Sequence, residues 1–209
     1  MRLKRVFIST LLFFIFINTT YFWEGQLGFF AFPLFLILVI AYIGLFIAFI
    51  GQFYLVIKEK FSNTFRLLTV SLLITVMVLT YFKPNGLIDF DKFQGKDILI
   101  AQREGAANCM TTIKLKDNFT FKERSVCFGV TEIKGDYRFQ NDTIYFDNVE
   151  TGRNKDKYYE FAVIKPSKYD KEKKQFELVR FKSLKDTIGH ELWITKNELN
   201  KLKNKKPTR

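Results

Sequence analysis

The pattern of apolar and polar positions divides the chain near residue 83. Before it, apolar residues form three long segments, at 6–23, 28–57 and 65–82. After about residue 97, apolar and polar residues alternate in short runs that are separated by turn residues. The first pattern is typical of membrane-spanning helices and the second of antiparallel strands. The sequence therefore predicts a helical membrane anchor followed by an all-β antiparallel meander.

The anchor is predicted to contain three transmembrane helices within residues 1–83. A spanning helix needs about 20 apolar residues, and the predicted helices cover about residues 6–23, 33–57 and 65–82. Pro33 fits the first turn of the second helix, where its missing N–H is not needed. The basic MRLKR before the first segment would suit a secretory signal, but no small-residue cleavage site follows. We therefore expect a retained anchor.

The charges beside the three segments indicate their orientation. The flanking cations before residue 83 are Arg2, Lys4, Arg5, Lys58, Lys60 and Arg66. The EGQL turn between the first two segments carries only Glu24. Because basic residues mark the cytoplasmic side, we expect a multi-pass protein of the inner (cell) membrane. Its N-terminus would be cytoplasmic and its C-terminal domain extracytoplasmic, a side that depends on the count of three helices.

A stripe of small residues runs along the second predicted helix, at Ala41, Gly44, Ala48 and Gly51. Such spacing lets another helix approach closely. We expect it to pack against the first or third helix of the same chain, and the alternative is a homo-oligomer interface in the bilayer. No charged residue or histidine lies in the three helix cores, so no ion or proton pathway is predicted.

The second half is predicted to form one β-domain over residues 97–195, after a linker at 84–96. The candidate strands are 98–102, 109–116, 119–128, 131–139, 142–146, 158–165, 175–181 and 190–195. Closing the sheet on itself satisfies its edge hydrogen bonds. We therefore expect an eight-stranded barrel or a strongly curved half-barrel, with an open sandwich as the alternative. The basic tail at 196–209 would lie on anionic lipid or remain a solvated end.

Both cysteines lie in one predicted hairpin. Its odd-numbered positions are mostly apolar, and its even-numbered ones carry lysine and arginine. A turn at Asp117 and Asn118, with Asn118 left-handed, pairs odd positions with odd. Cys109 then lies opposite Cys127, or one rung away, on the buried face. Outside the cytoplasm we expect a disulfide, and in a reducing cytosol two small buried side chains. Glu123 falls on the same buried face without an explanation.

Net charge adds a further restriction on partners. The chain has a formal net charge of +12, of which about +4 lies before residue 83 and about +8 after it. A positive surplus suits anionic lipid headgroups. In the second half the basic residues are interleaved with acids, so no stripe for a phosphate backbone is present and no nucleic-acid partner is expected.

Candidate chemistry is sparse. His190 and Glu191 are neighbours in a predicted strand, so their side chains would face opposite ways. Two cysteines and one histidine do not make a tetrahedral zinc site, and the acids around residue 140 do not have calcium-loop spacing. We predict no catalytic, cofactor or metal site and no enzyme activity. Arg103 and Glu104, in AQREGAAN, are expected in a loop that lines the mouth of the barrel.

The hairpin GDYRFQNDTIYF, at 135–146, resembles the repeated hairpins of small bacterial lipocalin-like and copper-resistance-lipoprotein-like β-barrels. The resemblance implies a barrel that binds a small apolar molecule or senses envelope conditions. A few helices before a barrel also resemble the membrane-anchored effectors of bacterial anti-phage systems. In those effectors a cytosolic barrel binds a cyclic nucleotide, on the side opposite to the one that the charges indicate here.

Three functional hypotheses follow. The first is a non-enzymatic membrane protein whose extracytoplasmic β-domain binds a small ligand or an envelope protein. The second is a nucleotide-sensing membrane effector with a cytosolic barrel. The third is a small hydrolase, for which no catalytic groups are found.

Overall fold

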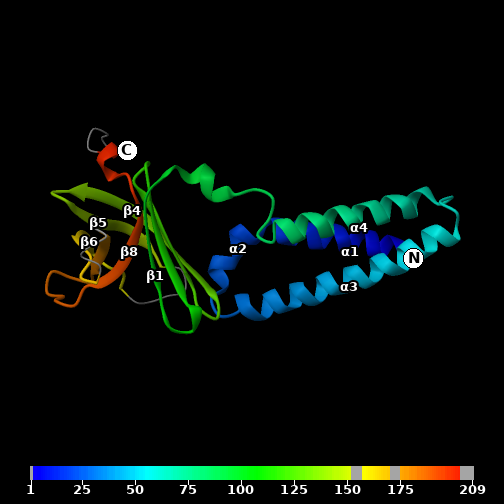
Figure 1. The fold of residues 1–209 in the computed structure, drawn as a ribbon, viewed down its shortest axis with the longest axis horizontal. Coiled ribbons are helices and arrows are strands. Elements are labelled where there is room, and N and C mark those ends of the chain that lie inside the picture. Colours follow the sequence, from blue (N-terminus) through cyan, green and yellow to red (C-terminus); the bar gives the residue numbers. More distant parts are fainter. Residues whose placement is uncertain (1, 152–156, 170–174, 203–209) are drawn as a thin grey trace. The chain divides into compact units, whose positions relative to one another are not determined.

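The computed structural model describes residues 2–151, 157–169 and 175–202. Their contacts form two units, shown in Figure 1. The helical unit consists of the residues up to Glu24 together with Phe29–Phe90. The barrel unit consists of Gly25–Gly28 and the residues from Asp91 onward. The end of the predicted tail, residues 203–209, lies outside the described residues.

The helical unit is built from apolar helices that share one small core. Its helices are α1 (Arg2–Asn18), α2 (Thr20–Leu27), α3 (Ala31–Lys58) and α4 (Thr64–Phe82). α1 packs against both α3 and α4, and the buried residues between them are Phe13, Ile17, Leu45, Leu73 and Val76. In the described part of the chain, α3 and α4 are each long and apolar enough to cross a membrane, and α1 with α2 adds a third crossing only if the bent pair is one span.

The prediction of a continuous first helix at 6–23 was wrong. The helix is bent by 67° between α1 and α2. Side chains at the bend bond to backbone carbonyls: Asn18 Nδ2 donates to the Phe14 oxygen at 2.8 Å and Thr20 Oγ1 to that of Ile17 at 2.9 Å. Such bonds compete with the helical ladder and bend helices. The predicted EGQL turn is helical as well, and the chain reverses after it, where Gly28 has a φ of 55°.

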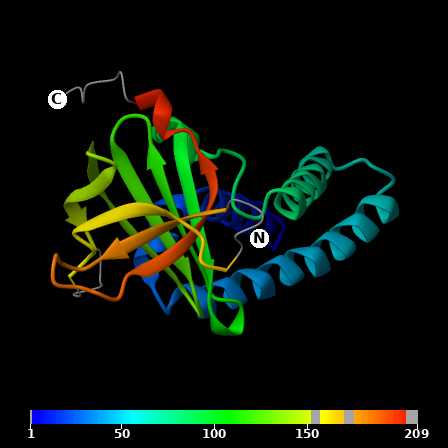
Figure 2. The same ribbon diagram turned by 60° about the vertical axis from the view of Figure 1, so that its left-hand side comes forward.

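The second half forms a closed antiparallel barrel of eight strands. They are β1 (Asp97–Glu104), β2 (Met110–Lys116), β3 (Thr120–Val126), β4 (Val130–Gln140), β5 (Thr143–Glu150), β6 (Phe161–Pro166), β7 (Phe176–Phe181) and β8 (His190–Asn197). Each strand pairs with the next, and β8 returns to pair with β1, as in Gln102 opposite Trp193. Figure 2 shows the strands curving round to close the sheet. The barrel is thus confirmed and the open sandwich is not formed.

The hairpin of β2 and β3 has the predicted register. Thr111 lies opposite Ser125, so odd positions pair with odd. Cys109 and Cys127 lie just beyond the strand ends, with their Cα atoms 4.5 Å apart, and their sulfur atoms are at disulfide distance. The prediction that both are buried was wrong, because Cys127 is exposed and Cys109 is half-buried.

The predicted left-handed residue of this hairpin was also wrong. Phe119, not Asn118, has the positive φ, of 65°. The Asn118 side chain is occupied otherwise: its oxygen accepts a hydrogen bond from the Thr120 backbone at 3.3 Å, and its Nδ2 donates to the Gln94 carbonyl at 3.0 Å. These bonds hold Asn118 in a local turn, and the left-handed backbone conformation is adopted by the next residue, Phe119.

A short 3-10 helix, η1 (Phe90–Gln94), leads into the barrel, and Asp91 is the anchor of this segment. The Asp91 carboxylate accepts a hydrogen bond from Lys114 Nζ at 2.6 Å. Lys116 Nζ, almost fully buried, donates to the Asp91 carbonyl at 3.0 Å and to Asp97 at 2.9 Å. The predicted linker at 84–96 is therefore tied to β2 over its last part.

Asp91→Asn should destabilise the barrel at neutral pH but not in acid. Burial alone would raise the pKa of Asp91, but the hydrogen bond from Lys114 and the charges of three nearby lysines outweigh burial and lower it. The stabilisation is therefore present above the unfolded pKa of about 3.9 and is lost as the pH falls through the folded pKa. We expect a cost of about 1 kcal/mol at neutral pH for this partly exposed pair, in which the Lys114 and Asp91 side chains are 33% and 15% exposed.

Urea unfolding of both proteins measures this cost. The difference from the parent chain should be present at about pH 7 and should vanish at about pH 2.5. Asp142→Asn, in the exposed turn between β4 and β5, is the matched control and should have no effect at either pH. A difference that persists in acid would show that the carboxylate charge is not what holds η1.

Candidate functional site

The interior of the barrel changes from apolar to polar toward the Glu104 end. Within the sheet, Ala101 and Ile113 lie opposite each other and are fully buried. Two positions further along, on the same face, lie Arg103, Thr111, Ser125 and Thr131, in register across β1 to β4. The hydroxyls of Thr111 and Ser125 are hydrogen-bonded at 3.1 Å. We call these four residues the polar rung.

A buried ion pair lies next to the polar rung. Glu123 on β3 lies opposite Ile113, one rung deeper. Its carboxylate accepts a hydrogen bond from Arg180 on β7 at 2.5 Å, and the two side chains are only 10% and 6% exposed. The hydroxyl of Tyr158, which precedes β6, donates a hydrogen bond to the same oxygen. Charges from opposite parts of the barrel wall therefore meet inside it.

The guanidinium of Arg180 is held from two further directions. It stacks over the Tyr159 ring at 4.2 Å from the ring centre, a cation–π contact. His190 lies opposite Arg180 across β7 and β8, and its ring contacts Tyr159 edge-on at 5.3 Å between centres. The Arg180 Nε atom is buried and has no hydrogen-bond partner among the described residues. One donor of this buried cation is thus left unused.

The electrostatics of the cluster favour an ionised pair and a neutral tyrosine. Burial alone would lower the pKa of Arg180, but the Glu123 carboxylate together with Tyr158 and Tyr159 outweighs burial and raises it. Burial, followed by the charge of Glu123, raises the pKa of Tyr158 well above its usual value. Tyr158 therefore stays a hydrogen-bond donor to Glu123 over the whole physiological range. Burial also raises the pKa of Tyr159, against the opposing charges of Arg180 and Arg103.

The polar residues at this end of the barrel present groups that can contact a ligand. The residues offer donors, namely guanidinium groups and hydroxyls, together with aromatic faces. Arg103, at the end of β1, is exposed, and its charge reaches Tyr159. No group of three or more His, Cys, Asp or Glu side chains in the described segments is placed to hold a metal ion. We call the polar rung with Glu123, Arg180, Tyr158, Tyr159 and His190 the polar end.

A hollow of about 390 Å³ on the barrel is the next candidate. Lys116 and Lys122 line it together with Gly135 and Glu150. Both lysines are already paired: Lys116 with Asp97 at 2.9 Å and Lys122 with Glu132 at 2.9 Å. These ammonium groups therefore connect barrel strands to their neighbours.

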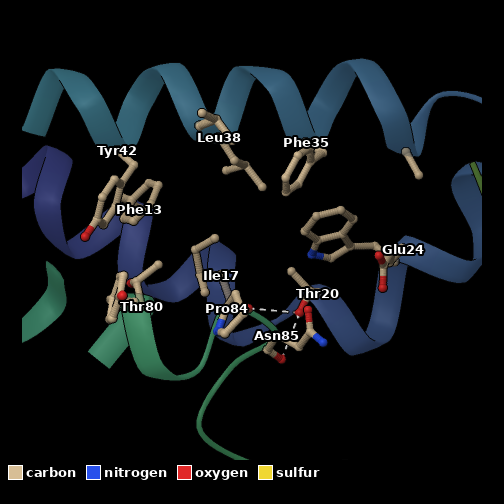
Figure 3. A pocket seen from close by; sticks show the side chains of 14 residues that line it. Phe13, Ile17, Thr20, Glu24, Phe35, Leu38, Tyr42, Thr80, Pro84 and Asn85 are labelled. Atoms are coloured by element: carbon tan, nitrogen blue, oxygen red, sulfur yellow. Dashed lines mark hydrogen bonds between the residues drawn. The ribbon is translucent and has the colours of Figure 1, made fainter. Parts of the chain in front are cut away.

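The helical unit contains a pocket of its own, of about 300 Å³. Figure 3 shows Phe35, Leu38 and Tyr42 of α3 on one wall, facing Phe13 and Ile17 of α1. Polar groups gather at one end of the pocket, where the Thr20 hydroxyl shares its proton between the Ile17 carbonyl at 2.9 Å and the Asn85 carbonyl at 3.2 Å, and Glu24 lies nearby. The rest of the lining is mostly apolar, but Thr80 at the opposite end carries a buried hydroxyl without a hydrogen-bond partner among the described residues.

The residues predicted as sites have different outcomes. Cys109 and Cys127 are brought together, as described above. Arg103 and Glu104 lie at the end of the barrel but in strand β1, not in the predicted loop. A Cβ atom at Gly44 or Gly51 would meet nothing within 4 Å in the described chain, so the expected packing against α1 or α4 is not formed at these glycines. The alternative, a homo-oligomer interface, stays a prediction.

The polar end was largely missed by the sequence analysis. Glu123 was noted as an acid on a buried face, and that signal called for a buried cation as its partner. Arg180 is that cation. It points into the barrel from β7, two positions after Leu178, which is buried and lies opposite the buried Leu192. Tyr158 lies outside the strands, and nothing in the local pattern connects it to Glu123.

Comparison of the chain with protein-family models, with curated proteins and with solved structures finds no match in any of the three.

Proposed function

We propose that this chain is a non-enzymatic integral membrane protein whose barrel lies outside the cytoplasm and binds a small ligand at its polar end. The ligand would carry a group that accepts hydrogen bonds, such as a carboxylate or a phosphate. The single observation that carries this proposal is Arg180: a guanidinium that is 6% exposed, with a buried Nε that has no partner among the described residues.

A purely structural role explains the ion pair less well. A buried salt bridge rarely adds stability, because the cost of desolvating two charges offsets their attraction, and apolar residues of similar volume are often as good or better. An isolated stabilising role would therefore not favour Glu123 and Arg180 at this place. A ligand that accepts hydrogen bonds would use the Arg180 Nε donor, which has no partner among the described residues. Hydrogen bonds from a guanidinium to a carboxylate or a phosphate are among the stronger ones in proteins.

The membrane part of the proposal rests on the helices and their flanking charges. If α1 and α2 together make one crossing, the chain crosses the bilayer three times. The cations Lys4, Arg5, Lys58, Lys60 and Arg66 then fall on one side. By the positive-inside rule that side is the cytoplasm. An odd number of crossings puts the barrel on the other side, where a disulfide between Cys109 and Cys127 is stable.

Thermal unfolding of the full chain in detergent tests the binding site. We would use inorganic phosphate, pyrophosphate and citrate as probes. A ligand at about 100 times its Kd stabilises the folded state by about 2.7 kcal/mol, which raises the Tm of a domain of this size by roughly 10 °C. Glu123→Leu combined with Arg180→Met should abolish the shift, and Arg138→Met, which removes a cation that is 62% exposed, should not. An equal shift in both variants would contradict the polar end as the site.

A reporter fused after Arg209 tests the orientation. We expect periplasmic alkaline phosphatase activity and no cytoplasmic fluorescence. Fluorescence without phosphatase activity would reverse the orientation. It would favour the alternative function, a nucleotide-sensing effector, because the donors of the polar end would equally suit a nucleotide phosphate in the cytosol.

A further inference from the structure

We propose that the pocket of the helical unit binds one acyl chain of a membrane phospholipid. The pocket has a volume of about 300 Å³, at the lower limit of sites that hold small molecules. Its walls come from α1, α2, α3 and the end of α4 with the residues that follow it. Of these helices α3 and α4 are candidate spans, and α1 with α2 is a third if the bent pair is one span. The inference rests on the insertion of these helices in a bilayer, and it does not depend on the ligand of the barrel.

The first argument is the length of the pocket. On α3 its lining runs from Ala31 to Tyr42, which is about 16 Å along a helix. The hydrocarbon core of a bilayer is about 30 Å thick, so the pocket extends through one leaflet. An acyl chain of that leaflet has the matching length and direction.

The second argument is the distribution of polar groups. Thr20, Glu24 and Asn85 lie at one end of the pocket (Figure 3). At its other end Phe13 and Tyr42, whose rings are 6.3 Å apart, lie near Thr80, so that end is mainly aromatic with one hydroxyl. Trp23 and Tyr81 also line the pocket, and Tyr81 is 75% exposed. Tryptophan and tyrosine prefer the membrane–water interface. The end of the pocket with Thr20, Glu24 and Asn85 therefore lies at the depth of the lipid headgroups, and the end with Phe13 and Tyr42 lies near the middle of the bilayer. A bound phospholipid would have its headgroup and its acyl chain at these depths.

The third argument is access from the lipid. Phe35 and Val39 belong to the lining, yet they are 59% and 38% exposed. Both lie on α3, which would be surrounded by lipid in a bilayer. A chain can therefore enter sideways between α1 and α3 without passing through water.

Native mass spectrometry of the full chain tests the proposal. The protein would be inserted in vesicles of palmitoyl-oleoyl phosphatidylethanolamine and phosphatidylglycerol, extracted in mild detergent and stripped of loosely held lipid. We expect one retained phospholipid per chain. Leu38→Trp, which fills the pocket, should lower the retained fraction at least tenfold. Ile40→Trp, on the same helix but 68% exposed and outside the lining, should leave it unchanged.

Further outcomes are equally decisive. A parent chain that retains no phospholipid, an equal loss in both variants, or a protein dimer in place of the lipid would overturn the proposal. Circular dichroism checks that Leu38→Trp keeps its helices. If it does not, the smaller pair Val39→Phe and Ile40→Phe makes the same comparison. Carbonate extraction tests membrane insertion separately, so a failure of the proposed membrane anchoring is distinguished from a failure of the pocket.

Discussion

Arg180→Met should lower the free energy of unfolding of the barrel by about 3–5 kcal/mol. The substitution leaves the Glu123 carboxylate, which is only 10% exposed, without its cation. Tyr158 still donates to it, but one neutral hydrogen bond does not compensate a buried charge. Urea unfolding followed by Trp193 fluorescence, in a Trp23→Phe background, measures the effect on the barrel alone.

The double variant Glu123→Leu/Arg180→Met separates stability from function. Because both charges are removed together and apolar side chains replace them, we expect it to be nearly as stable as the parent chain, or more stable. Arg138→Met is the control for loss of an exposed arginine and should change the free energy of unfolding by less than about 0.5 kcal/mol. If the double variant were as unstable as Arg180→Met, the pair would be a structural element of the barrel, and the proposed ligand site would lose its main support.

The barrel itself could be predicted from the sequence because its signals are local. Alternation of apolar and polar residues gave all eight strands to within a few residues, and the odd-to-odd register followed from one turn. The polar end could not be predicted in the same way. Glu123 and Arg180 are separated by 57 residues and belong to strands that are not neighbours, so only the closure of the barrel brings them together.

The errors in the helical unit and in the hairpin have a common cause. A search for runs of apolar residues does not detect the effect of side chains such as Asn18 and Thr20, which bond to the helix backbone and bend it. In the same way, Asn118 is a favourable left-handed residue by type, but its side-chain bonds to Gln94 and Thr120 decide otherwise. Residue preferences predict an element and its period, whereas the boundary of the element depends on bonds that its polar side chains make with other segments.

Reduction of the bond between Cys109 and Cys127 should destabilise the barrel by about 3 kcal/mol. The two residues are 18 positions apart in the chain. A crosslink that closes a loop of about this size lowers the conformational entropy of the unfolded state, which stabilises the folded state by about 3 kcal/mol. A disulfide at this place would also join β2 to β3 at the end of the barrel where the polar rung lies. Unfolding with and without dithiothreitol measures the difference, and Cys109→Ala/Cys127→Ala should be as unstable as the reduced protein and insensitive to the reductant.

The same bond reports on the compartment. We expect no thiol to react with an alkylating reagent in unreduced protein isolated from cells, and two thiols to react after reduction. The two cysteines lie beyond the strand ends, and Cys127 is exposed, so burial would not protect free thiols. Two readily alkylated thiols before reduction would therefore mean a reducing environment. A barrel that is stable without this crosslink in the cytosol would agree with an even number of membrane crossings, in which α1 and α2 do not form a span.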